Sequence, residues 1–205
     1  MSNTFTEIDH RAFRHDVVDG LSEIAMAFFF LVPAFTIREP AFGWMIIFPV
    51  LFMGPWLKKL RARHTWPRIG YVKPRGENAG EMLIGMAVYV FVVLAVVGVG
   101  IFVFRGEIKP GLIRQVSPLI ASVLFGGGLL YAAGRSGLRR YYVLLGLSLA
   151  LGIALTAVTV PGRYLSVQIY LLGMGAITFA VGLITFIHFI RTHPIRDLGE
   201  ADDAE

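Results

Sequence analysis

The sequence predicts an all-α polytopic membrane protein, a six-transmembrane-helix bundle with both termini in the cytoplasm. First, five stretches of 18 to 27 residues contain no Asp, Glu, Lys or Arg, and about 20 apolar helical residues cross a bilayer core about 30 Å thick. Second, 56% of the 205 residues are hydrophobic and only 16% are charged, a composition that a soluble domain of this length does not accommodate. Third, the basic residues are distributed unevenly between the two sides of the bundle.

The first span is expected at 18–37, where the apolar run reaches spanning length only by including Glu23. The uncharged stretches give the other five spans, at about 40–57, 82–104, 115–134, 141–162 and 164–190. These five uncharged stretches are apolar around the whole helix, which is typical of membrane spans. Since Arg38-Glu39-Pro40 leaves room for only a tight turn, the first two spans should form an antiparallel hairpin.

The segments outside the spans are polar. Residues 1–17 form a tail or a short interfacial helix, for which Thr4 and Glu7 have the spacing of a capping box. Because this segment is polar, we expect no cleavable signal peptide. A basic cytoplasmic loop is expected at 58–81, and an acidic, disordered tail at 191–205.

The distribution of basic residues predicts how the chain is oriented in the membrane, and the absence of cysteine excludes several kinds of site. Fourteen of the nineteen Lys and Arg residues fall on the side that holds both tails and the 58–81 loop. The positive-inside rule puts that side in the cytoplasm, and we expect a multi-pass protein of a prokaryotic cytoplasmic (inner) membrane. The chain has no cysteine, which excludes disulfides, thiolate metal sites and cysteine nucleophiles.

Acidic residues at the entry of the first span form the first candidate site. The spacings between Asp16, Asp19 and Glu23 place their carboxylates on one side of a helix. A carboxylate inside the membrane should face the bundle or a wet cavity. The three are therefore candidate ligands for an ion or small polar substrate, or candidates for acid–base chemistry. His188, near the cytoplasmic end of the last span, is a further candidate for ion or substrate binding as a titrating partner of Glu23, or else an interfacial hydrogen-bonding residue.

Two other interpretations of the same carboxylates stay open. His15, Asp19 and Glu23 recur at spacings of four, and this makes them candidate ligands for a metal of unknown identity. Alternatively, Arg68 or Arg75 folds back onto Asp19 or Glu23, and the ion pair locks the hairpin. The chain has no His-Glu-x-x-His motif and no Ser-centred glycine elbow, so we expect no cofactor and favour a protein that is not an enzyme.

The 58–81 loop is the second candidate site, with seven basic and two acidic residues. Cations next to a span attract anionic lipid headgroups by about 1 kcal/mol each. Prolines and aromatic residues between the charges are also typical of a shaped loop that holds a phosphate or carboxylate, or docks a protein. Nucleic acid is not an expected partner, because the loop is short and held at the membrane. The candidate lipid- or anion-binding residues are Lys58, Lys59, Arg61, Arg63, Arg68, Tyr71, Lys73 and Arg75.

Pairs of small residues four positions apart predict close helix crossings, within the bundle, between copies in a homo-oligomer, or with a partner membrane protein. The pairs are Ser122/Gly126, Gly128/Ala132, Gly146/Ala150 and Ala176/Ala180.

The Asp-Gly-Leu-Ser-Glu segment at 19–23 and the Pro-Arg-Ile-Gly-Tyr-Val segment at 67–72 together resemble a group of small prokaryotic multi-spanning membrane proteins of uncharacterised activity. The resemblance covers about residues 14–75. It implies that the acidic entry of the first span and the basic loop belong together.

Three functions are consistent with these features. The first is transport or permeation of an ion or small polar solute through a cytoplasmic vestibule at Asp19 and Glu23. The second is a non-catalytic scaffold or partner subunit that binds anionic lipid or a cytoplasmic protein through residues 58–75. The third is an intramembrane enzyme acting on a lipid-like substrate.

Overall fold

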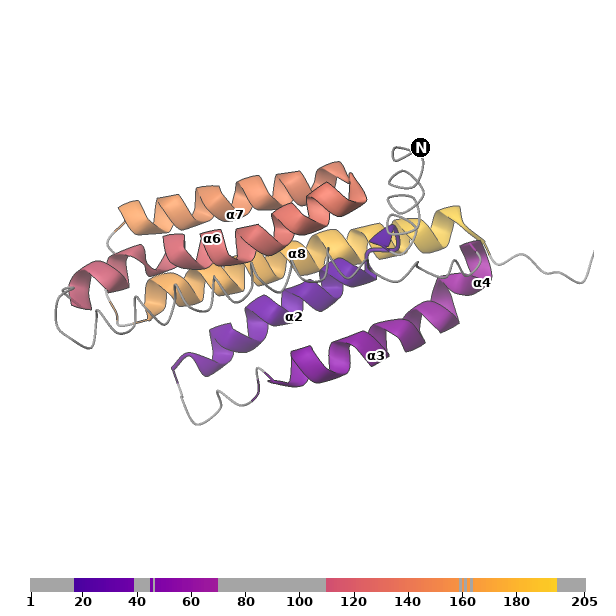
Figure 1. Ribbon diagram of the computed structural model, residues 1–205, viewed down its shortest axis with the longest axis horizontal. Coiled ribbons are helices and arrows are strands. Elements are labelled where there is room, and N and C mark those ends of the chain that lie inside the picture. Colours follow the sequence, from indigo (N-terminus) through magenta and orange to yellow (C-terminus); the bar gives the residue numbers. More distant parts are fainter. Residues whose placement is uncertain are drawn as a thin grey trace, which may run out of the picture. The chain divides into compact units, whose positions relative to one another are not determined.

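The computed structural model describes residues 17–38, 45, 47–69, 110–158, 160, 162 and 164–194. The regular elements of this part of the chain are all helices, as predicted (Figure 1). They are α2 (Leu21–Thr36), α3 (Ile47–His64), α4 (Trp66–Ile69), α6 (Pro110–Ser136), α7 (Arg139–Ala157) and α8 (Leu165–Thr192).

Three of the described helices, α6, α7 and α8, are long and apolar enough to cross a membrane. They cover the predicted spans 115–134, 141–162 and 164–190 with ends that differ by a few residues. α2 is a shorter apolar helix of 16 residues. The predicted span at 82–104, the tail 1–16, residues 70–81 and residues 195–205 lie outside the described residues. The helices therefore indicate a membrane protein.

The chain divides into two compact units, Met1–Lys73 with Leu171–Glu205, and Pro74–Tyr170. The boundary falls inside α8. The first unit contains α2, α3, α4 and most of α8, and the second contains α6, α7 and the start of α8.

In the first unit, α2 begins later than the sequence predicts. Gly20 adopts a left-handed conformation with φ 78°, which favours glycine. The Asp19 side chain accepts a hydrogen bond from the backbone N–H of Leu21 at 3.0 Å. Short polar side chains of this kind compete with helical hydrogen bonding. Asp19 therefore lies in a turn before the helix, and the expectation that Asp19 and Glu23 share one helical face was wrong.

α3 ends later than the predicted span. The predicted loop starts at residue 58, but α3 continues to His64. Lys, Arg and Leu have high helix propensity, and cations in the last turn interact favourably with the helix dipole. Arg61, Arg63 and His64 occupy that last turn. The first seven residues of the predicted loop are thus helical, and their spacing along one helix decides which cations turn inward.

In the second unit, α6 and α7 form a helical hairpin joined at Gly137, which has φ 64°. The Gly137 N–H donates to the Ala133 carbonyl at 2.9 Å, as at many helix C-termini. The helices approach closely where Gly152 of α7 faces Ser122 of α6. The hydroxyl groups of Ser148 and Tyr170, both buried, lie 2.7 Å apart and satisfy each other.

Candidate functional site

The first unit contains a buried polar cluster built around Asp19. The Asp19 side chain is fully buried, and its Oδ2 atom accepts hydrogen bonds from Arg61 Nε at 3.1 Å and Thr65 Oγ1 at 3.0 Å. Its Oδ1 atom accepts from the Leu21 N–H. Arg61 Nη2 donates in addition to Ser22 Oγ at 2.7 Å. Asp19, Ser22, Arg61 and Thr65 are called the Asp19 cluster below.

The Asp19 cluster joins the start of α2 to the end of α3. Arg61 and Thr65 are four residues apart and therefore lie on the same side of the chain where α3 ends. The Thr65 N–H closes that end by donating to the Arg61 carbonyl at 2.9 Å. The Arg61 side chain is only 13% exposed. Hydrogen bonds from this many donors, one of them a guanidinium, to one buried carboxylate hold the two helices in register.

The described residues contain an ion pair between the acidic entry and the basic segment, formed by an arginine that the sequence did not single out for this role. Arg61 pairs with Asp19. Arg68 instead donates to the backbone carbonyls of His64, Ile190 and His193, so it does not serve as the predicted clamp on Asp19. Arg75 lies outside the described residues.

Arg68 connects α4 to the C-terminus of α8. Its Nη1 atom is 3.2 Å from the Ile190 oxygen and 2.6 Å from the His193 oxygen. A cation at this position satisfies carbonyl groups that the helix leaves without partners and complements its dipole. The rings of His64 and Phe186 meet edge to face with centroids 6.2 Å apart, which adds a second contact between α3 and α8.

The remaining acidic and histidine candidates are dispersed. Glu23 is fully buried in the first turn of α2, whereas His188 is exposed on α8. Asp16 and His15 lie outside the described residues. Within the described ranges, no three His, Cys, Asp or Glu side chains gather closely enough to hold a metal ion.

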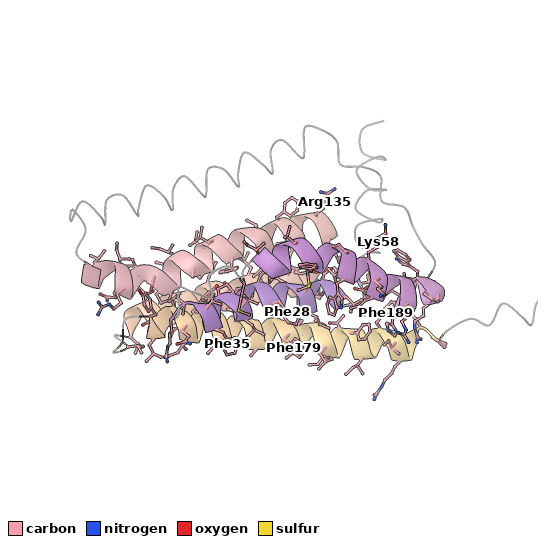
Figure 2. All side chains as sticks on the ribbon, turned by 90° about the horizontal axis from the view of Figure 1, so that it is seen from below. Phe28, Phe35, Lys58, Arg135, Phe179 and Phe189 are labelled. Carbon is pink, nitrogen blue, oxygen red and sulfur yellow. The ribbon has the colours of Figure 1, made fainter. Side chains whose placement is uncertain are left out.

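The basic residues of 58–75 separate into two groups. Arg61 and Arg68 turn inward to protein acceptors, whereas Lys58, Lys59 and Arg63 are exposed. Lys58 extends away from α3 in Figure 2. Tyr71, Lys73 and Arg75 lie outside the described residues. The exposed cations form a basic surface at the end of α3, called the α3 basic surface below.

Sequence reasoning missed Ser22 and Thr65 as members of the Asp19 cluster. The signal was present in the spacings, because Ser22 follows Asp19 by three residues and Thr65 follows Arg61 by four. The spacing of four between Arg61 and Thr65 indicates a shared side only because α3 continues past Lys58. Comparison of the chain with protein-family models, curated proteins and solved structures finds no match.

Proposed function

We propose that this chain is a non-catalytic, six-span protein of a prokaryotic cytoplasmic membrane that binds anionic lipid headgroups through the α3 basic surface. The observation that carries the proposal is the separation of the cations on one helix. Arg61 is held by Asp19, while Lys58, Lys59 and Arg63 are exposed where α3 ends. Exposed cations beside a span attract anionic headgroups electrostatically.

Lipid binding is preferred to transport through a vestibule because of the state of Asp19. A vestibule needs a carboxylate that a solute can reach. Asp19 is fully buried, and each of its oxygens already accepts a hydrogen bond from the protein. We therefore assign Asp19 a structural role, and the α3 basic surface the binding role.

Removing two cations from the α3 basic surface should weaken headgroup binding about thirtyfold at low salt, since each contributes about 1 kcal/mol. The variant is Lys58→Gln/Arg63→Gln, and the measurement is calorimetric titration of detergent-solubilised protein with short-chain phosphatidylglycerol. Raising the salt concentration should narrow the difference from wild type, because exposed charges are screened.

The matched control for headgroup binding removes two exposed cations from the opposite predicted side, Arg38→Gln/Arg114→Gln. It should bind the lipid as wild type does. Equal weakening in both double variants would show a response to net charge alone and would contradict the proposal.

The six-span topology with cytoplasmic termini can be tested directly, because the chain has no cysteine of its own. We expect Arg38→Cys and Tyr164→Cys to react with a membrane-impermeant maleimide in spheroplasts. Arg63→Cys and Arg139→Cys should react only after permeabilisation. All four native residues are exposed, so a cysteine that is not labelled is protected by the membrane and not by burial in the protein. Reaction of Arg63→Cys in intact spheroplasts would overturn the orientation.

A further inference from the structure

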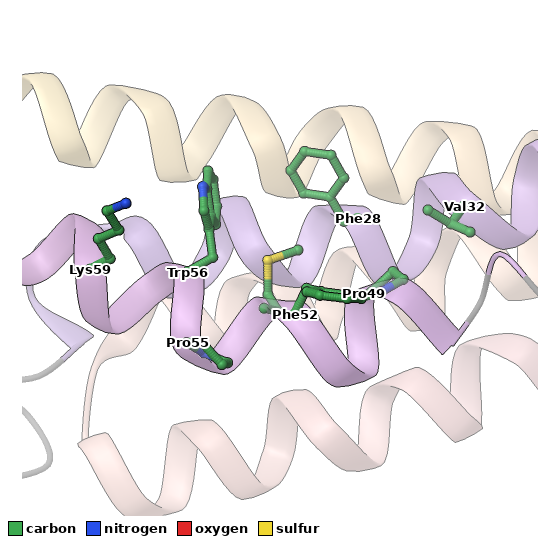
Figure 3. Close-up of a pocket in the computed structure, with 8 residues that line it drawn as sticks. Phe28, Val32, Pro49, Phe52, Pro55, Trp56 and Lys59 are labelled. Carbon is green, nitrogen blue, oxygen red and sulfur yellow. The ribbon is translucent and has the colours of Figure 1, made fainter.

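An apolar groove of about 480 Å³ lies between α2 and α3 in the first unit (Figure 3). This volume falls within the range of about 300–1,000 Å³ that is typical of small-molecule sites. Two of its lining residues, Phe28 and Val32, come from α2. The others come from α3 and are Pro49, Phe52, Met53, Pro55, Trp56 and Lys59.

The groove has a fixed wall on one side. The Phe28 and Trp56 rings meet edge to face with centroids 6.5 Å apart, so an α2 residue supports the indole from α3. Much of the apolar lining is accessible: Phe52 is 60% exposed and Trp56 is 42% exposed. In a membrane protein such a surface faces acyl chains, and a concave one can hold a single chain in a defined position.

The length of the groove matches one bilayer leaflet. From Pro49 to Lys59 the helix rises ten residues, about 15 Å at 1.5 Å per residue. The hydrocarbon core of a bilayer is about 30 Å thick, so each leaflet contributes about 15 Å. A single acyl chain of a phospholipid spans that depth.

The two ends of the groove differ in polarity. Pro49 lies at the apolar end, and Lys59, which is exposed, lies at the other. Trp56 is one turn before Lys59, and indoles favour the headgroup level of a membrane. A lysine there extends its ammonium toward the headgroups while its alkyl stem covers apolar surface. The ammonium group of Lys59 at this end of the groove therefore favours a lipid with a negatively charged headgroup.

We propose that this groove binds one acyl chain of an anionic phospholipid, with the headgroup phosphate at Lys59. The inference rests on the proposed function, because it gives the lipid bound at the α3 basic surface a site for its chain. It also goes further, because it predicts a defined lipid position and not only a charged surface.

The test uses Trp56 as its own reporter, in the full-length Trp44→Phe/Trp66→Phe chain reconstituted in nanodiscs. Phosphatidylglycerol or phosphatidylcholine with dibrominated acyl chains is added at equal mole fractions. We expect the phosphatidylglycerol to quench Trp56 fluorescence more strongly, and unlabelled phosphatidylglycerol to reverse the quenching in a saturable way. Lys59→Gln should lower this preference about fivefold. Arg191, on α8, is exposed and neither lines the groove nor belongs to the α3 basic surface, so Arg191→Gln should change the preference less than twofold.

Native mass spectrometry compares the wild-type chain with Lys59→Gln, without the Trp substitutions. We expect Lys59→Gln to carry one fewer bound phosphatidylglycerol than wild type. Equal effects of Lys59→Gln and Arg191→Gln would overturn the groove as the site. Absence of quenching by either lipid would also overturn it, because no acyl chain would then lie beside Trp56. A thirtyfold loss of short-chain lipid binding in Lys58→Gln/Arg63→Gln, together with no Trp56 preference, would leave the proposed function standing without the groove. A Trp56 preference for phosphatidylglycerol without the thirtyfold loss would leave the groove standing without the proposed function.

Discussion

Replacing Asp19 by Ala should lower the free energy of unfolding by about 3 kcal/mol, the lower end of the range for breaking a buried ion pair. The loss has two sources. Arg61, only 13% exposed, keeps its charge without the carboxylate, and Thr65 loses the acceptor for its hydroxyl. The residual exposure of Arg61 and its bond to Ser22 keep the effect from being larger. Unfolding by SDS in mixed micelles, followed by far-UV circular dichroism, measures the change.

A double-mutant cycle separates the ion pair from simple loss of packing. Arg61→Met in the Asp19→Ala background removes the buried guanidinium that has lost Asp19, so the double variant should be more stable than Asp19→Ala alone. Arg63→Ala serves as the matched control two residues from Arg61. Arg63 is exposed, and we expect its replacement to change stability by no more than about 0.5 kcal/mol. If Asp19→Ala and Arg63→Ala were equally mild, the Asp19 cluster would not be holding α2 to α3.

The sequence predicts the long helices α6, α7 and α8 well, because charged residues mark their limits. Arg114 and Arg135 bound the uncharged run of α6, Arg140 precedes that of α7, and Arg191 follows that of α8. The observed ends lie within a few residues of these positions. Charged residues are costly inside a bilayer and mark where a span ends.

The same logic places the ends of α2 and α3 less well. Hydropathy treats Lys58 as the end of a span, but a helix does not need to end where it leaves the hydrocarbon. Asp19 and Gly20 stop α2 from beginning at residue 18 through local hydrogen bonding and a left-handed backbone. The mean hydropathy of a sequence window detects neither the local hydrogen bond nor the left-handed backbone.

The candidate site was predicted in kind and missed in detail. An acidic group at the entry of α2 does meet a guanidinium from the segment after the second apolar stretch. The choice of Arg68 or Arg75 depended on treating residues 58–81 as a loop that begins where the second span ends. Once α3 extends to His64, the helix sets the direction of Arg61 and directs Arg63 elsewhere.

Small residues were also only partly informative. Ser122 does lie at a close crossing, where Gly152 approaches it. Ala176 and Ala180 are exposed, however, and do not mark a buried crossing within the described chain. Within the first unit, the close approach of α8 to α2 instead uses Gly175 and Gly182, which are seven residues apart. A search for spacings of four does not find that pair, although seven residues return a helix to nearly the same face.

Gly182→Ala is expected to destabilise the protein by about 2 kcal/mol, the cost typical of overpacking a close contact. A Cβ atom at Gly182 would lie 2.8 Å from the Ile24 nitrogen and 2.9 Å from the Gly20 oxygen. Both are backbone atoms, so no side-chain rotation relieves the overlap. Either α8 must move away from α2, or the turn at Gly20 must change and disturb Asp19 beside it.

Gly128→Ala is the matched control for Gly182→Ala, since it makes the same substitution inside α6. Among the described residues, a Cβ atom at Gly128 would meet no other atom within 4 Å. Alanine has higher helix propensity than glycine by about 1 kcal/mol, so this variant should be as stable as wild type or more stable. The difference between the two variants, measured by the same SDS titration, isolates the helix contact from the general effect of replacing glycine. Two variants of equal stability would mean that α2 and α8 do not approach at Gly182, and the turn holding Asp19 would then lack its support from α8.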